Sequence, residues 1–230
     1  MALILVAAGS GERLGAGMPK ALALLCGESL LAHSLRGAFG CRDVAHVVIV
    51  APSSHLERCR DIVGLLADHA RVDVVAGGVD RSASVEAGLG ALRPEDRIVL
   101  VHDVARCLAP SDLFDRVVSA VRAGHPAVVP GLPVSDTIKV VDAQGGVLAT
   151  PDRESLRGIQ TPQGFLREVL EHAHEHAQAA VASATDDAGL VEQAGGRVRV
   201  VAGDHRALKI TSPFDLVVAT TLLLDGPHVG

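Results

Sequence analysis

Short apolar runs recur along the chain, and segments with a helical spacing of apolar residues separate them. The runs that we expect to form buried strands cover residues 3–8, 45–50, 72–76, 98–101, 127–130 and 198–201. Between two of these runs, Val85, Leu89 and Leu92 recur at three- and four-residue spacing, which is typical of a helix. Strands that alternate with helices form parallel sheets covered on both faces. The pattern therefore predicts an α/β fold with a single doubly wound, mostly parallel sheet.

Polar residues and glycines at the borders of the helical segments indicate where helices begin and end. Ser29 precedes a leucine-rich helix, and Ser111 is expected to cap an amphipathic helix that Gly124 ends. Another helix is expected over 165–181. The sequence Ser-Pro-Phe-Asp at 212–215 is typical of a cap, a proline in the first helical position and a capping-box carboxylate. The last helix is therefore expected to begin there.

The alternating pattern breaks after residue 133. Two short apolar runs, 137–141 and 147–150, are joined by the turn sequence Asp-Ala-Gln-Gly-Gly, which predicts a β-hairpin. A two-stranded hairpin is marginal in water, and its apolar edge invites pairing with another chain. We therefore expect residues 133–160 to form a protruding arm that contacts a second copy in a homodimer.

Composition restricts the class of protein. A chain of 230 residues is long enough for one α/β domain, expected over 1–230. Aromatic residues make up 2% and the formal net charge is −6, which argues against a nucleic-acid binder. The spacing of the cysteines fits neither a zinc site nor a redox motif; they are Cys26, Cys41, Cys59 and Cys107. The apolar start has no basic segment before it, and no apolar run approaches the ~18 residues of a membrane span. We expect a cytoplasmic protein without a membrane partner.

The first apolar run ends in a glycine-rich turn that reads Gly-Ser-Gly-Glu-Arg-Leu-Gly at 9–15 and leads to Pro19-Lys20. Glycines after a buried strand let backbone N–H groups approach phosphate oxygens closely. Arg13 and Lys20 add positive charge. The segment therefore predicts a phosphate site.

Two common glycine motifs do not fit this turn. The dinucleotide fingerprint requires a third glycine where Leu14 stands, and the next strand ends in Ala-Pro rather than in the acidic residue that would bind a ribose. A Walker loop requires Ser or Thr after its lysine, and Ala21 follows Lys20. A tight turn with a solvated Arg13 and Lys20 is the structural alternative, and the rigid Pro19 before the lysine favours the phosphate site.

Two further strand ends carry candidate chemistry. Residues 77–84 form a second glycine turn, and turns at the carboxyl ends of parallel strands can face one crevice. Spacing alone does not separate this interpretation from an ordinary turn in which Ser82 or Ser84 caps the helix. Asp103 ends the most apolar run, where a carboxylate could bind Mg²⁺ near a nucleotide triphosphate. An Asp103–Arg106 ion pair is the structural alternative.

The motif at 7–13 followed by Pro19-Lys20 resembles the signature of nucleotidyltransferases that join a sugar or alditol phosphate to a nucleoside triphosphate. Later motifs narrow the resemblance to the 2-C-methyl-D-erythritol 4-phosphate cytidylyltransferase family of non-mevalonate isoprenoid biosynthesis. These motifs lie at 77–84, 102–106, 133–139, 152–161, 185–187 and 209. Val104 departs from the family pattern, which has alanine at this position. The resemblance covers nearly the whole chain and implies a Rossmann-like nucleotidyltransferase fold.

The resemblance also implies a reaction and a set of site residues. A phosphate oxygen of the acceptor attacks the α-phosphorus of CTP in line and releases pyrophosphate, with Mg²⁺ or another divalent cation as cofactor. The implied catalytic residues are Arg13, Lys20, Arg153 and Lys209. CTP is expected to bind at Ala7, Ala8, Gly9, Ser10, Gly11, Gly78, Ser84, Asp103 and Val104, with Asp103 also the metal ligand. The acceptor phosphate is expected at Arg106, Thr137, Arg153, Thr161 and Lys209.

Two rival functions stay open at this stage. A sister cytidylyltransferase that uses ribitol 5-phosphate shares the nucleotide half, and a nucleotide-binding regulator would share the fold without the chemistry. Without the resemblance, Arg153 and Lys209 would be taken for solvated charges. His172, His174 and His176 lie on one expected helix, and only the first and last have the i, i+4 spacing that a helical metal site favours. We expect these histidines to lie on a solvated face.

Overall fold

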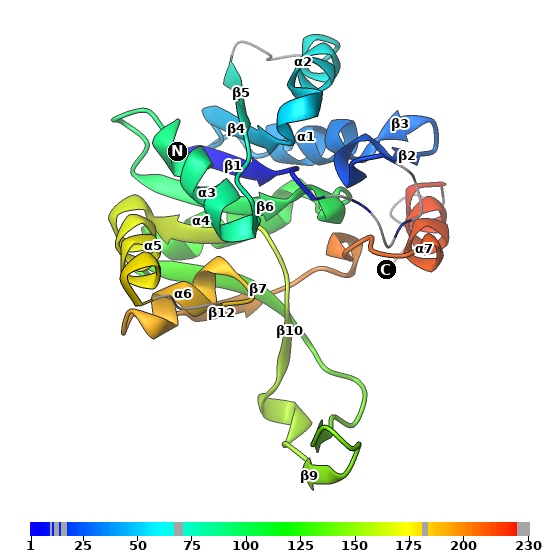
Figure 1. Cartoon of the computed structure of the whole chain (residues 1–230), viewed down its shortest axis with the longest axis vertical. Coiled ribbons are helices and arrows are strands. Elements are labelled where there is room, and N and C mark those ends of the chain that lie inside the picture. The colour runs from blue at the N-terminus through cyan, green and yellow to red at the C-terminus, as the bar shows by residue number, and fades with distance from the viewer. Residues whose placement is uncertain (10, 12–13, 15–17, 67–70, 181–183, 225–230) are drawn as a thin grey trace.

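The computed structural model describes residues 1–9, 11, 14, 18–66, 71–180 and 184–224. Within these residues the central element is an eight-stranded sheet in which the strands follow the order β10-β7-β11-β6-β1-β4-β5, with β12 paired to β7 (Figure 1). Its strands are β1 (Ala2–Val6), β4 (His46–Ala51), β5 (Val72–Ala76), β6 (Ile98–Asp103), β7 (Ala127–Pro133), β10 (Arg157–Ile159), β11 (Gln163–Leu166) and β12 (Arg199–Ala202). Strands β2 (Leu24–Leu25) and β3 (Glu28–Ser29) form a separate small hairpin.

Helices cover both faces of this sheet, which confirms the predicted doubly wound α/β class. They are α1 (Leu30–Gly40), α2 (Leu56–Gly64), α3 (Arg81–Gly90), α4 (Ser111–Arg122), α5 (Arg167–Ala180), α6 (Asp187–Gln193) and α7 (Pro213–Leu224). One core cluster joins α1, α2 and α4 to one side of the strands, and a second joins α3, α5 and α6 to the other. Short 3-10 helices are η2 (Lys20–Leu22), η3 (Ser53–His55), η5 (Val104–Arg106), η6 (Arg153–Ser155) and η7 (His205–Ala207). No helix in the described part of the chain is long and apolar enough to cross a membrane.

The order of the strands places several strand ends together. After β1 the chain builds β4 and β5 on one side, then crosses to β6 on the other, and all three pairings are parallel. Val6 at the end of β1 is in register with Asp103 at the end of β6, and Ala51 pairs with Ala76 at the ends of β4 and β5. Ligands of open α/β sheets bind at such a reversal of strand order.

Strands β10 and β11 are antiparallel to their neighbours, and the apolar pattern did not predict them. Residues 163–166 pair with β6 and β7, so the helix expected from residue 165 begins at Arg167 instead. Gly164 allows α4 to pack closely on this strand, because a Cβ there would lie 2.5 Å from a methyl group of Val117. The pairing is set by contacts with distant strands rather than by local periodicity.

The predicted helix borders are mostly confirmed. Ser29 accepts a hydrogen bond from the Ala32 N–H at the start of α1, and Asp215 accepts bonds from the backbone and hydroxyl groups before α7. Gly124 follows α4 with a positive φ of 100°. The prediction for Ser111 is wrong: Pro110 holds the cap position, with no side-chain cap, and Ser111 is the first residue of the helix.

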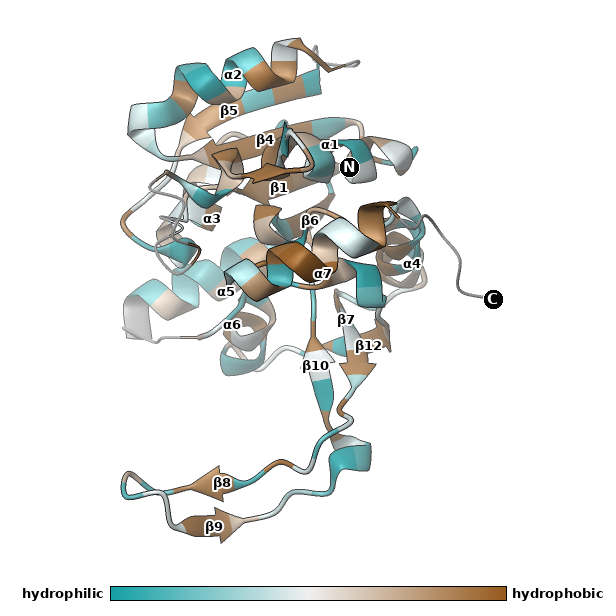
Figure 2. Cartoon of the chain, turned by 90° about the vertical axis from the view of Figure 1, so that its right-hand side faces the viewer, coloured by the Kyte–Doolittle hydropathy of each residue, from teal (hydrophilic) through white to brown (hydrophobic). Residues whose placement is uncertain are grey.

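The predicted hairpin is confirmed, with shorter strands, as β8 (Val140–Val141) and β9 (Val147–Ala149). It lies at the end of an arm that projects away from the central sheet (Figure 1). Four of its apolar side chains are exposed, and they colour the two strands brown in Figure 2; they are Val140, Val141, Val147 and Leu148. Exposed apolar side chains on a two-stranded ribbon are typical of a surface that a partner covers.

Candidate active site

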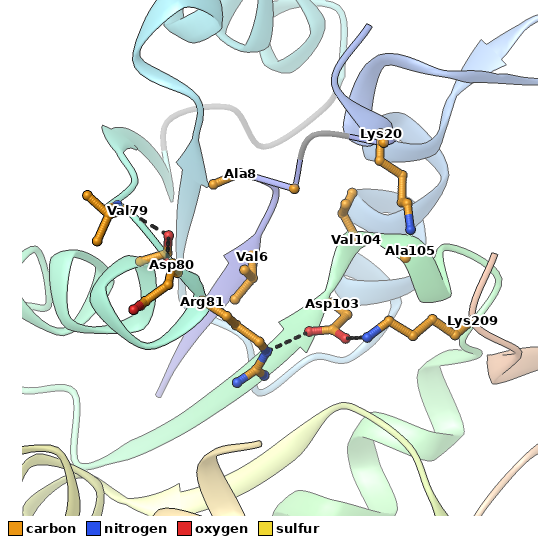
Figure 3. A pocket seen from close by; sticks show the side chains of 14 residues that line it. Val6, Ala8, Lys20, Val79, Asp80, Arg81, Asp103, Val104, Ala105 and Lys209 are labelled. Atoms are coloured by element: carbon orange, nitrogen blue, oxygen red, sulfur yellow. Dashed lines mark hydrogen bonds and ion pairs between the residues drawn. The ribbon is translucent and has the colours of Figure 1, made fainter. Parts of the chain in front are cut away.

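A cavity of about 590 Å³ lies at the carboxyl edge of the sheet, beside the reversal of strand order. Both glycine turns, the end of β6 and the loop before α7 contribute to its wall. Nine of the residues predicted from the sequence line it, namely Ala8, Gly9, Gly11, Lys20, Gly78, Ser84, Asp103, Val104 and Lys209. Ser10 and Arg13 were also predicted and lie outside the described residues. Segments far apart in the sequence therefore meet here (Figure 3).

The first glycine turn is closed by the segment that carries the lysine. Gly11 has a φ of 76°, and a Cβ on it would lie 2.9 Å from both the Lys20 nitrogen and the Met18 oxygen. The Lys20 N–H donates to the Gly9 carbonyl over 3.2 Å. Only glycine accommodates both the positive φ and this close approach. The turn thereby fixes the position of the Lys20 backbone. Figure 3 shows the Lys20 side chain extending toward Ala105.

The second glycine turn is built by Asp80 rather than by a serine cap. The Asp80 side chain accepts from the Ala83 N–H over 2.8 Å and caps α3, so the alternative in which Ser82 or Ser84 caps this helix is wrong. Ser84 instead donates to the Asp80 carbonyl over 2.7 Å and accepts from the Gly78 N–H over 3.2 Å. Ser84 therefore stabilises the turn through hydrogen bonds to its backbone.

Asp103 is a carboxylate of the cavity wall with two cationic partners. Its Oδ2 lies 2.7 Å from Lys209 Nζ and its Oδ1 lies 3.3 Å from Arg81 Nε (Figure 3). Burial by itself raises the pKa of this carboxyl, but the charges of Arg81 and Lys209 outweigh burial and lower the pKa from 3.8 to about 2. The alternative of an Asp103–Arg106 ion pair is wrong. The site holds an ionised carboxylate between two cations.

Arg106 and Thr161 have partners that anchor the wall of the cavity. Arg106 donates to the carbonyl oxygens of Ala207 over 2.7 Å and Ile159 over 3.1 Å. The Thr161 hydroxyl accepts from the Asp103 N–H over 3.0 Å and is 2.9 Å from His102 Nδ1. Both side chains therefore tie β10 and the loops near α7 to the end of β6, and their contact with an acceptor phosphate stays a prediction.

Three further predicted residues, like Arg106 and Thr161, are not among those that line the cavity of one chain. Thr137 and Arg153 are exposed on the arm, where Arg153 donates to the Ser135 carbonyl over 2.9 Å. Ala7 is fully buried, and its N–H donates to the Val50 carbonyl over 2.8 Å. Ala7 therefore packs in the core and links the chain before the first turn to strand β4.

Sequence reasoning missed a buried network behind the cavity. Arg81 Nη1 donates to Asp187 Oδ2 over 2.7 Å, and His174 Nε2 lies 3.1 Å from Asp187 Oδ1. The expectation of a solvated histidine face holds for His172 and His176, which are exposed, and is wrong for His174, which is 2% exposed. The signal was present, because the buried positions 170, 173, 174 and 177 follow the i, i+3, i+4, i+7 spacing of a core-facing stripe.

The described residues contain no group of three or more His, Cys, Asp or Glu side chains that could hold a metal ion by themselves. Asp103 is an ionised carboxylate in the cavity wall, and both of its oxygens face cations. Mg²⁺ commonly keeps one or two carboxylate ligands and takes the remainder from substrate phosphates and water. The residues present fit a metal that a nucleotide triphosphate carries in, and they do not form a preformed metal cage.

Comparisons with known proteins agree on one family. A family model described as 2-C-methyl-D-erythritol 4-phosphate cytidylyltransferase (IspD) matches residues 1–225. The chain is 51% identical to the bifunctional enzyme IspD/IspF of Clavibacter michiganensis, covering 100% of this chain and 56% of that protein. It is 48% identical to 2-C-methyl-D-erythritol 4-phosphate cytidylyltransferase of Rhodococcus opacus, covering 96% of this chain and 94% of that one.

A solved structure shows the same architecture. The fold is similar to that of 4-diphosphocytidyl-2C-methyl-D-erythritol synthase from Anaerococcus prevotii, with a TM-score of 0.86, 29% identity and 97% of each chain covered. The chain spans about half the length of the bifunctional relative and nearly all of the monofunctional one.

Proposed function

The chain belongs to the 2-C-methyl-D-erythritol 4-phosphate cytidylyltransferase family, and we propose that the cavity at the carboxyl edge of its sheet is where the family's reaction takes place. The enzyme couples CTP with 2-C-methyl-D-erythritol 4-phosphate to give 4-diphosphocytidyl-2-C-methyl-D-erythritol and pyrophosphate. One observation carries the proposal: the cavity combines two glycine turns with the cationic side chains of Lys20, Arg81 and Lys209. Such a wall suits a triphosphate and a second phosphate together.

The two glycine turns bind different parts of the nucleotide. The first turn presents backbone groups and Lys20 to the phosphates of CTP, as backbone nests do for other anions. The second turn, with Gly78 and the internally bonded Ser84, receives the cytidine. Val104 lies in the wall at the position where the family pattern has alanine.

The reaction needs no protein nucleophile. An oxygen of the acceptor phosphate attacks the α-phosphorus of CTP, a new P–O bond forms, and the bond to the β-phosphate breaks with its electrons leaving on pyrophosphate. Both reactants are anions, so the protein contributes mainly position and charge neutralisation. Lys20, which lines the cavity, offsets charge that develops on the phosphoryl oxygens in this proposal. Arg13 has the same role in the proposal and lies outside the described residues.

Lys209 orients the acceptor phosphate on the opposite side of the cavity. Its side chain is 42% exposed while the Asp103 carboxylate beneath it is 12% exposed, so the ammonium can reach an anion without leaving the wall. Arg106 and Thr161 line the same end of β6 and complete the acceptor side in the proposal.

Thr137 and Arg153 complete this site from a second copy of the chain. Both lie on the arm that projects from the sheet, and within one chain neither lines the cavity. The exposed valines and leucine of β8 and β9 give the arm a surface for a twofold mate. We therefore propose a homodimer whose arms exchange.

We propose that a divalent cation, namely Mg²⁺, binds together with CTP. Asp103 is the residue that would hold it, together with the phosphates of the nucleotide. A bound cation would supply neutralisation of phosphate charge.

A release assay for pyrophosphate tests the proposed function. CTP should release pyrophosphate with 2-C-methyl-D-erythritol 4-phosphate and not without an acceptor, and chelation of divalent cations should stop release. Ribitol 5-phosphate is the matched alternative acceptor. Faster pyrophosphate release with ribitol 5-phosphate would identify that compound as the acceptor. If neither acceptor supported release, the protein would bind nucleotides without catalysing this reaction.

A further inference from the structure

His174 occupies a buried place between three helices that cover one face of the sheet. It lies on α5, and the helices α3 and α6 lie next to α5 on the same side of the molecule in both Figure 1 and Figure 2. Its exposed fraction is 2%, against an exposed His172 and His176 on the same helix. A buried imidazole needs hydrogen-bond partners, and each of its ring nitrogens has one within 3.5 Å.

The partners of His174 come from the two flanking helices. Nε2 lies 3.1 Å from Oδ1 of Asp187, the first residue of α6. Nδ1 lies 3.4 Å from the Ser82 hydroxyl and 3.5 Å from Glu86 Oε1, both on α3. Because a carboxylate oxygen accepts, the nitrogen that faces Asp187 carries a proton. His174 therefore donates to a carboxylate that is itself 1% exposed.

Asp187 connects this histidine to the cavity. Its second oxygen, Oδ2, accepts from Arg81 Nη1 over 2.7 Å, and Arg81 Nε in turn lies 3.3 Å from Asp103 Oδ1. A continuous series of polar contacts thus runs from His174 to the carboxylate in the cavity wall. Figure 3 shows its last members, with Arg81 and Lys209 on either side of Asp103.

We propose that His174 is a positioning residue for the nucleotide cavity, acting through the Asp187 carboxylate on Arg81. The inference rests on the proposed function, because the cavity must bind CTP for the position of Arg81 to matter. His174 occupies one oxygen of Asp187 and leaves the other for a single bond from Arg81. Arg81 then keeps its Nε directed at Asp103.

Loss of the histidine donor would change this division. With both oxygens available, Asp187 would attract the guanidinium into a two-bond pair, the geometry that arginine and carboxylate prefer. Arg81 would turn away from Asp103 and leave Lys209 as the remaining described partner of that carboxylate. The less compensated negative charge of Asp103 would then repel the incoming triphosphate. CTP binding should weaken more than the chemical step.

Three substitutions at one position separate positioning from packing. His174→Leu removes the donor at similar volume. His174→Gln places an amide nitrogen close to where Nε2 lies, and His174→Asn is polar but one methylene too short. His172→Leu and His176→Leu are matched controls on the exposed side of the same helix. If the leucine variant at 174 does not fold, the asparagine variant replaces it.

Steady-state kinetics with CTP and the acceptor give the readout, with melting temperature as a check on folding. We expect His174→Leu and His174→Asn to raise KM for CTP by about tenfold, as loss of one charge-assisted contact predicts, with a smaller change in kcat. His174→Gln and both controls should stay within about twofold of the wild type. In an Asp187→Asn background, His174→Leu should add no further rise in KM.

The outcomes distinguish this inference from the proposed function. If the unsubstituted enzyme releases no pyrophosphate with any acceptor, the proposed function fails. If it is active and His174→Leu and His174→Asn retain the KM for CTP, or if the effect persists undiminished beside Asp187→Asn, the positioning role is wrong. An equal loss in His174→Gln would also overturn it, because the donor would then be irrelevant.

Discussion

Lys209 Nζ lies 2.7 Å from Asp103 Oδ2, so a residue of the loop before the last helix forms an ion pair at the end of the central strand β6. The two side chains differ in exposure: that of Lys209 is 42% exposed and that of Asp103 is 12% exposed. The carboxylate has a second cationic partner in Arg81, whereas the lysine faces the open cavity. The pair therefore holds a partly exposed cation in the cavity wall, where we propose that the acceptor phosphate binds.

Substitution of Lys209 should impair the acceptor side of the reaction. Lys209→Gln removes the cation but retains a polar side chain, and we expect kcat/KM for the acceptor to fall by about 10²-fold. The melting temperature should change little, because a pair with a partly exposed lysine contributes little net stability. Steady-state kinetics with varied acceptor measure the effect, and Arg60→Gln on the exposed face of α2 is the control. A loss confined to KM for CTP would contradict the assignment.

Lys20→Ala should fold normally and lose turnover. The backbone of Lys20 closes the first turn through its N–H, which alanine retains, and only the side chain is removed. A cation directed at developing phosphoryl charge typically contributes ~10²- to 10³-fold in rate. Single-turnover rates with saturating CTP measure the loss, and circular dichroism checks the fold. A kcat close to that of the unsubstituted enzyme would remove Lys20 from the catalytic set.

The sequence predicted those parts of the fold and site whose determinants are contiguous. Both glycine turns and Asp103 directly follow apolar runs, so strand, turn and chemistry could be placed together. Parallel order then brings these strand ends to one edge. The glycines themselves were informative, because Gly11 needs a positive φ that other residues rarely adopt.

The remainder depends on contacts between distant residues. The partners of Asp103 could not be read from spacing, and the nearby Arg106 was the only candidate that local sequence offered. The observed Arg81–Asp187 bond joins residues 106 positions apart. Strand β11 was hidden for the same reason, since its pairing with β6 and β7 overrides a local pattern that suited the start of a helix. Such choices follow from the assembled sheet.

The second glycine turn should favour a pyrimidine nucleotide. A Cβ on Gly77 would lie 2.8 Å from the Ala8 Cβ, so the two turns approach each other closely, and one on Gly78 would lie 2.3 Å from the Ala83 Cβ within its own turn. We expect CTP to raise the melting temperature more than ATP or GTP at equal concentration in Mg²⁺. The measurement is a thermal shift series with each nucleotide. Equal stabilisation by all three would show that this turn does not select the base.

His102 should make the enzyme less stable below pH 6.5. The ring is fully buried beside Phe114, and burial lowers the pKa of His102 from 6.5 to about 4. Between these values the unfolded chain binds a proton that the folded chain does not, so the free energy of unfolding falls as the pH falls. The shift corresponds to a loss of about 3 kcal/mol over this range.

His102→Asn tests this origin of the pH dependence, because asparagine can still bond Thr161 and does not titrate. Urea unfolding at several pH values from 7 to 4 gives the free energy of unfolding for both proteins. The variant should show the shallower decline toward pH 4, whatever its stability at pH 7. Parallel declines would place the acid sensitivity at other groups.

If the arm crosses to a second copy, each active site should contain residues from two chains. Lys20 lines the cavity of its own chain, whereas Arg153 lies on the arm and bonds the arm's own Ser135 carbonyl. If the arms exchange, Lys20→Ala and Arg153→Ala homodimers should both be nearly inactive. A mixed dimer would collect both substitutions in one site and leave the other site intact.

Mixing the two inactive variants should therefore restore activity. Random exchange gives half of the dimers as mixed, each with one intact site of two, so roughly a quarter of the unsubstituted activity is expected for a twofold assembly. Differently tagged chains and a double pull-down establish that subunits have exchanged. If Lys20 and Arg153 served the same chain's cavity, every site in the mixture would carry a substitution. Exchange without recovery of pyrophosphate release would therefore reject the shared site, whereas recovery near a quarter would support arms that cross between chains.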